Sequence, residues 1–167
     1  MPLIKLNATQ GLTGTLPAVS GANLTNIDGG KVLQVVQTTS NTGIETTSET
    51  FQDIISLNIT PSATSSKVLI LITHPFRKVN SDASNTSIGL RILKDGSSII
   101  DWGNYMAWNN NQAQYNQETA SINFLNSPST TSQVTYKSQF KTQHASGRVS
   151  VNHDSSYSSM TLMEIAV

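Results

Sequence analysis

The residues best suited to chemistry form a short His–carboxylate pair near the end of the chain. His153 and Asp154 are adjacent, and His144 stands nine residues earlier. A carboxylate-held imidazole is what general-base hydrolysis uses, and two imidazoles with a carboxylate could ligate a metal. No His-Glu-x-x-His, Gly-x-Ser-x-Gly or Walker run accompanies them. We therefore favour a turn between strands for this pair, and predict no catalytic residue, no metal site and no cofactor.

Two other ionisable residues lie inside apolar surroundings. His74 precedes Pro75 and follows a run of aliphatic residues, so we expect it at the end of a strand. Glu164 stands among apolar residues near the C-terminus, where strand alternation favours an outward position. An inward Glu164 would need a partner such as Arg91 or Lys137, because an unpaired buried carboxylate is costly.

Residues 101–117 hold both tryptophans and two of the four tyrosines, interleaved with Asn and Gln. Aromatic faces cover the C–H faces of sugars, and amides pair with their hydroxyls, so this composition is suited to a neutral glycan. The alternative, which we favour, is that the large rings pack the domain core or a subunit interface. The candidate glycan or interface contacts are Trp102, Tyr105, Trp108 and Tyr115.

The composition is polar without being charged. Ser, Thr, Asn and Gln account for 68 of the 167 residues, whereas charged residues make up 12% and the net charge is zero. Such a chain has no electrostatic footprint for nucleic acid or an anionic membrane surface. It also has no Cys, which excludes disulfides, thiolate metal sites and a cysteine nucleophile.

Short apolar or alternating runs separated by turn residues predict an all-β protein, a jelly-roll β-sandwich, with a sandwich of different wiring as the alternative. Asp95-Gly96 between two such runs is a strong hairpin signal, because the turn needs positive φ. The expected strands are 31–38, 54–60, 67–73, 87–93, 97–102, 117–125, 133–142, 148–152 and 159–166.

Two of these runs predict which side chains face the core. In 133–142, Val134, Tyr136 and Phe140 should point one way and the intervening polar residues the other. Residues 68–72 are apolar at every position. We therefore expect this strand in the middle of a sheet with both faces covered.

Residues 1–30 differ from the rest of the chain. They are rich in Gly and nearly uncharged, yet too apolar for a simple spacer. We interpret them as an extended arm that anchors on a neighbouring surface, ahead of a β-sandwich domain at 31–167; a disordered tail is the alternative. The candidate anchoring residues are Leu12, Leu16, Pro17, Val19, Leu24 and Ile27.

The arm sequence from Gly11 to Thr25 resembles the segment that precedes C-terminal domains in tailed-phage virion proteins, notably those of cyanophages. Further stretches similar to that group follow in the expected order, at 30–36, 59–70, 90–96 and 160–165. The resemblance implies a jelly-roll sandwich, commonly a homotrimer, on the outside of a virion. It carries no catalytic residues to transfer.

Within that group the domain serves either as a capsid decoration (cement) protein or as the tip of a fibre. An arm of about thirty residues starting at Met1, without a long shaft, favours decoration. The expected partners are further copies of the chain and a major capsid or other virion protein, on a virion surface assembled in the host cytoplasm. The alternative is a receptor-binding tip of a tail or head fibre that recognises a host surface glycan.

Overall fold

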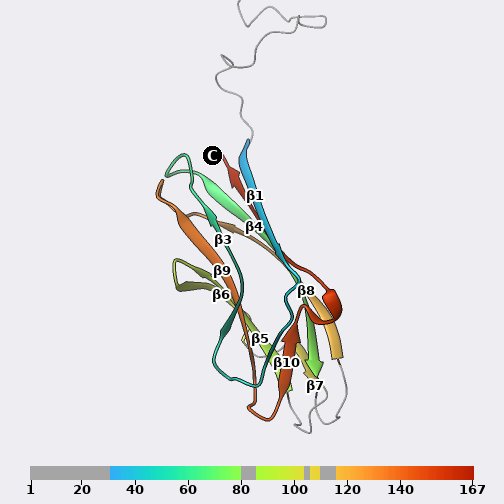
Figure 1. The fold of residues 1–167 in the computed structure, drawn as a ribbon. Coiled ribbons are helices and arrows are strands. Elements are labelled where there is room, and N and C mark those ends of the chain that lie inside the picture. Colours follow the sequence, from blue (N-terminus) through green and yellow to red (C-terminus); the bar gives the residue numbers. More distant parts are fainter. Residues whose placement is uncertain (1–30, 80–85, 104–105, 110–115) are drawn as a thin grey trace, which may run out of the picture.

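The computed structural model of the protein describes residues 31–79, 86–103, 106–109 and 116–167, which form two layers of antiparallel strands (Figure 1). β-Branched and aromatic residues alternate with polar ones through most of the chain, a pattern that suits half-buried pleated surfaces. The elements are β1 (Val32–Ser40), β2 (Ile44–Thr46), β3 (Gln52–Ile59), β4 (Lys67–Val79), β5 (Thr86–Lys94), β6 (Ser97–Asp101), β7 (Met106–Asn109), β8 (Asn116–Asn126), β9 (Val134–Thr142), β10 (Arg148–Val151), the 3-10 helix η2 (His153–Ser155) and β11 (Ser158–Ile165).

The strand pairing has the wiring of a jelly roll. Sheet A has the order β1-β11-β4-β10-β2, with β8 on the other edge of β4, and sheet B has the order β3-β9-β5-β6, with β7 also beside β5. Early strands therefore pair with late strands in nested order, β1 with β11, β3 with β9, β4 with β8 and β5 with β6. A long hairpin rolled into two sheets produces this nesting. The predicted jelly-roll sandwich is confirmed.

The longest strand, β4, is the spine of sheet A. Its first half pairs with β11 up to Thr73, its second half pairs with β10 from Phe76, and its other edge pairs with β8 along nearly the whole length. Pro75 lies on the first of these edges, at the point where the neighbouring strand changes from β11 to β10. The N–H that proline lacks is therefore not needed for strand pairing. The expectation that His74 ends the strand is therefore wrong.

All nine expected strands are present, with ends shifted by at most two residues except in β4, which continues six residues beyond the expected end to Val79. The sequence reading missed β2 and β7, of three and four residues, because runs this short carry no measurable alternation. The expected arm at 1–30 lies outside the described residues. Across the part of the chain that is described, no helix is long and apolar enough to cross a membrane.

The predicted hairpin is formed by β5 and β6. Asp95 and Gly96 have φ of 48° and 83°, the positive values that a two-residue turn of this type needs. The turn is also tied to the start of β9, because the amide of Thr135 donates to Asp95 Oδ1 at 2.9 Å and the amide of Asp95 donates to the carbonyl of Thr135 at 2.9 Å.

The core lies between the two sheets. Val134, Tyr136 and Phe140 are fully buried there, as predicted, and meet Val68, Ile70, Ile72 and Phe76 of β4 in one apolar cluster. The hydroxyl of Tyr136 donates to Asn126 Oδ1 at 2.7 Å, which joins β9 to β8. Burial and the nearby Asp95 charge raise the pKa of Tyr136 to about 12, so the hydroxyl stays a donor.

Candidate functional site

The outer face of sheet B carries a ladder of charged and amide groups. Asp53, Gln139, Arg91 and Asp101 follow one another across β3, β9, β5 and β6. The Arg91 Nε donates to Gln139 Oε1 at 2.7 Å, and Gln139 in turn donates to Asp53 Oδ1 at 2.5 Å. The ammonium of Lys137 pairs with the other oxygen of Asp53 at 2.7 Å. Asp53, Gln139, Arg91 and Lys137 are thus hydrogen-bonded among themselves at the surface, as expected of a solvated face, whereas Asp101 accepts from the amide of Gly103.

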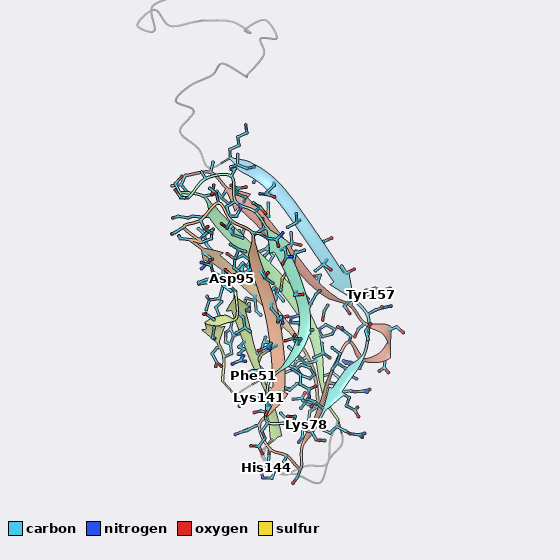
Figure 2. The ribbon with its side chains drawn as sticks, turned by 60° about the vertical axis from the view of Figure 1, so that its left-hand side comes forward. Phe51, Lys78, Asp95, Lys141, His144 and Tyr157 are labelled. Atoms are coloured by element: carbon cyan, nitrogen blue, oxygen red, sulfur yellow. The ribbon has the colours of Figure 1, made fainter. Side chains whose placement is uncertain are left out.

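Phe51 sits beside this ladder. The Arg91 guanidinium lies 4.0 Å from the Phe51 ring centroid and the Lys141 ammonium 5.1 Å from it, and Figure 2 shows Phe51 and Lys141 side by side. Both cations contact a ring face, a favourable cation–π arrangement. Although partial burial opposes ionisation of Asp53, hydrogen bonds from Lys137 and Gln139 lower the pKa of its carboxyl.

The outer face of sheet A is different, because three successive rows across four strands carry no charge. We call these twelve residues the uncharged face. Each row crosses β1, β11, β4 and β8 in register. The rows are Val35, Met163, Leu69 and Leu125; then Gln37, Thr161, Leu71 and Asn123; then Thr39, Ser159, Thr73 and Ser121.

The first row is apolar from one edge of the sheet to the other. Val35 is 55% exposed and Leu125 48% exposed at the two edges, and Leu71 in the next row is 37% exposed. Residues 68–72 do lie mid-sheet, as predicted, but the expectation that both faces are covered is wrong for the described residues. Val68, Ile70 and Ile72 are buried in the core, whereas the outward leucines have no layer of described residues over them. A contiguous apolar patch rimmed by polar groups marks an interaction surface.

Glu164 points into the sandwich and is fully buried, so the favoured outward position is wrong. Its partners are neither Arg91 nor Lys137. Gln34 Nε2 donates to Glu164 Oε2 at 2.6 Å, and the amide and hydroxyl of Ser62 donate to Oε1 at 2.7 and 2.6 Å. Burial opposes ionisation, but the Ser62 and Gln34 hydrogen bonds prevail and lower the pKa of Glu164 to about 2.

His74 is fully buried and joins the two sheets. Its Nε2 lies 2.9 Å from Ser138 Oγ of β9 and its Nδ1 lies 2.7 Å from Ser158 Oγ of β11. The Ser158 hydroxyl donates to Asn152 Oδ1 at 2.5 Å, while Asn152 Nδ2 donates to the carbonyl of Thr42. Ser158 must therefore accept from His74, which assigns the proton of the neutral ring to Nδ1. Burial lowers the pKa of His74 to about 4.

Lys78 is a buried amine near the far end of β4 (Figure 2). Its side chain is inaccessible to solvent, and its Nζ has no hydrogen-bond partner among the described residues. Burial lowers the pKa of Lys78. Nothing in the sequence around it signalled this position, since Lys at the end of a strand is ordinarily solvated.

The His153–Asp154 pair lies in the turn that the sequence favoured, in η2 between β10 and β11. Asp154 pairs with the guanidinium of Arg77 at 3.3 Å, while the Nδ1 of His153 has no hydrogen-bond partner in the described part of the chain. His144 lies in the β9–β10 turn and accepts from the amide of Ser146. The described residues contain no cluster of three groups that could hold a metal ion.

Of the four aromatic candidates, Trp102 alone has a described side chain. It follows β6, is 37% exposed, and its amide donates to the carbonyl of Leu90 at 3.0 Å. Trp108 belongs to β7, where the backbone is described but the indole is not. Tyr105, Tyr115 and the six arm residues lie outside the described residues. The glycan and anchoring assignments stay predictions.

Neither a protein-family model nor a curated protein matches the chain. Among solved structures, a particle of infectious bursal disease virus strain Gx shares 16% identity, with a TM-score of 0.43, over 79% of this chain and 36% of the viral chain. A T13 particle of that virus gives 13% identity and a TM-score of 0.45 over 90% of this chain and 41% of the other. Latent PorU from Porphyromonas gingivalis gives 10% identity and a TM-score of 0.39 over 78% of this chain and 12% of the PorU chain. At these values the likenesses decide nothing about function.

Sequence reasoning missed the uncharged face, although part of its signal was visible. The unbroken apolar run at 68–72 pointed to a strand with two apolar faces. What was missing was the register that puts Val35, Met163 and Leu125 beside Leu69, because pairing between strands distant in sequence cannot be read from local patterns.

Proposed function

We propose that this chain is a non-enzymatic structural protein of a virus particle, a trimeric capsid decoration protein that clamps neighbouring capsid subunits. The difference in charge between the ladder on sheet B and the uncharged face on sheet A carries the proposal. Sheet B presents a solvated ladder of charges, whereas sheet A presents twelve uncharged residues with an apolar row. The jelly roll is an architecture of capsid domains, and the ordered resemblance to tailed-phage virion proteins supports the same class.

The mechanism would be mechanical. Apolar burial and hydroxyl or amide hydrogen bonds would hold the protein to its neighbours, with little dependence on ionic strength because the contact surface has no charges. Three arms per trimer would raise the effective affinity of each short segment, since binding of the first makes the others intramolecular. Residues 1–30 would anchor the protein on the particle.

Copy number tests this role against the fibre alternative. Quantitative gel or mass-spectrometric analysis of purified particles should give about one copy per major capsid protein. A ratio of a few copies per hundred would overturn the decoration role and favour a fibre tip. Particles without the protein should also break sooner under heat or osmotic shock.

The anchoring part of the proposal is tested in the full chain. Leu16→Asp and Val19→Asp should abolish binding to particles that lack the protein, because they put a charge into the apolar contact. Thr15→Asp and Ser20→Asp add the same charge at neighbouring polar positions and serve as controls. Equal binding of all four variants would show that the arm is not the anchor.

A receptor-binding tip is the second candidate, and the exposed ring of Trp102 is the observation in its favour. Under that role Trp102→Ala should abolish binding to host surface polysaccharide, while Phe51→Ala, which removes an aromatic ring on sheet B, should not. Binding to host cells by the wild-type chain, together with low copy number, would establish this role instead.

A further inference from the structure

We propose that the uncharged face of sheet A is where a second copy of this chain docks. The inference rests on the proposed function, because it names the partner of the uncharged face on which that proposal is based. It assigns the particle contact to the arm and the contact between copies to the twelve residues of β1, β11, β4 and β8 defined above.

The chemistry of the uncharged face suits contact with a second copy. Thr, Ser, Asn and Gln side chains both donate and accept hydrogen bonds, so each can pair with its own kind. Carboxylates only accept and ammonium groups only donate, so a face with charges of one sign meets its own copy with repulsion. A face that combines apolar and hydroxyl or amide groups and has no charges is complementary to itself, which is what a twofold contact between two copies requires. The threefold contacts of the proposed trimer join two different patches of each copy and are a separate interface.

The apolar groups of the uncharged face are arranged in a way that two copies can match. Val35, Met163, Leu69 and Leu125 form one continuous row, so two copies can bury the row against each other as sheets do in a sandwich, about 10 Å apart. Met163 lies inside the row, and its flexible thioether can fill gaps at a contact between flat surfaces. Gln37 and Thr161 of the next row are already hydrogen-bonded to each other at 2.8 Å.

The outer face of sheet B offers no comparable docking surface. There Asp53, Arg91, Lys137 and Gln139 satisfy one another, and covering them would desolvate an ion-pair network without a new partner. The same chain therefore has one outer face that is stable in water and another that gains from being covered. Along β4, the charged residues on either side of the uncharged face are Lys67 and Arg77, near opposite ends of the strand.

The test is the mass of the full-length protein in solution, measured by light scattering and sedimentation velocity. The wild type should be oligomeric at micromolar concentration. Val35→Glu and Leu125→Glu, which place a charge at exposed edge positions of sheet A, should weaken self-association by about 100-fold. Ser56→Glu and Asn58→Glu make the matched change on β3, an edge strand of sheet B, and should leave the mass unchanged.

A second measurement covers the case in which the Glu variants fail to fold. Because the chain has no Cys, Leu71→Cys introduces a single thiol on the face, and a short bis-maleimide should cross-link two copies. Ser56→Cys should give no cross-linked product. A monomeric wild type, or Cys variants that cross-link equally poorly, would overturn the inference.

The outcomes separate this inference from the proposed function. If the wild type is a monomer and Leu125→Glu loses particle binding, the face contacts the capsid and the self-docking inference is wrong while the virion role stands. If Leu125→Glu has a lower mass than the wild type and the wild type binds no particle, the interface stands and the virion role is wrong.

Discussion

Nε2 of His74 lies 2.9 Å from Oγ of Ser138, and this contact joins sheet A to sheet B inside the sandwich. On its other side the imidazole donates to Ser158, which donates to Asn152. The chain of hydrogen bonds fits a neutral ring, because Nδ1 donates and Nε2 accepts. A proton added to Nε2 would place a charge on a buried ring whose hydrogen-bond partners among the described residues are two hydroxyl groups, which makes this position sensitive to acid.

We expect the free energy of unfolding to fall as the pH drops from about 6.5 to about 4. The pKa of His74 is about 4 in the folded protein against 6.5 for an ordinary His, so below pH 6.5 the unfolded chain binds a proton that the folded protein excludes. The loss should reach about 3 kcal/mol. Urea unfolding at several pH values measures it. His74→Gln should flatten this dependence, and His144→Gln, in an exposed turn, should not; an unchanged slope in His74→Gln contradicts the assignment.

Glu164→Gln should destabilise the protein by about 2 kcal/mol at pH 7, because Ser62 and Gln34 lose a charged acceptor. The folded pKa of about 2 lies below the ordinary 4.5, so this stabilisation is complete above pH 4.5 and is lost as the pH falls towards 2. The difference between wild type and variant should therefore shrink over that interval.

The control for Glu164 is Glu45→Gln, which breaks the exposed ion pair with Arg148. It should change the free energy of unfolding by less than about 0.5 kcal/mol. Equal effects of the two substitutions at pH 7 would show that burial of Glu164 does not matter.

Lys78→Met should stabilise the protein by about 1–3 kcal/mol, because it replaces a buried amine without a partner among the described residues by an apolar chain of similar length. Lys94→Met is the matched comparison: its Nζ donates to the carbonyl of Pro128 at 3.1 Å, so its loss should be neutral or destabilising. Thermal unfolding of both variants at pH 7 provides the measurement. A destabilised Lys78→Met would mean that the amine has a stabilising role.

Gly96→Ala should cost about 1 kcal/mol even though a Cβ there would meet nothing within 4 Å. The whole cost arises from φ of +83°, which L-residues rarely adopt. Gly43→Ala is the matched control, since its Cβ would only come into ordinary contact with the carbonyl oxygen of Asn152 at 3.5 Å. Denaturant midpoints should separate the two; equal values would remove the conformational explanation.

Much of the fold could be read from local patterns. Alternation in 133–142 placed Val134, Tyr136 and Phe140 in the core, and Asp95-Gly96 located a hairpin, because side-chain period and turn chemistry act over a few residues. The same rules failed at His74, where Pro75 suggested a strand end. Only the change of neighbour from β11 to β10 shows why a proline can stand inside β4.

By itself the sequence determined the all-β class, the polar uncharged composition and most strands. The tertiary structure decided the rest, because strand register brings together residues far apart in the chain. Glu164 meets Gln34 and Ser62 across 130 and 102 positions, and Val35 reaches Leu125 only through Met163 and Leu69. A polar composition spread evenly along the sequence thereby becomes two unlike surfaces, the charged and solvated ladder of sheet B and the uncharged face of sheet A, which is available for contact.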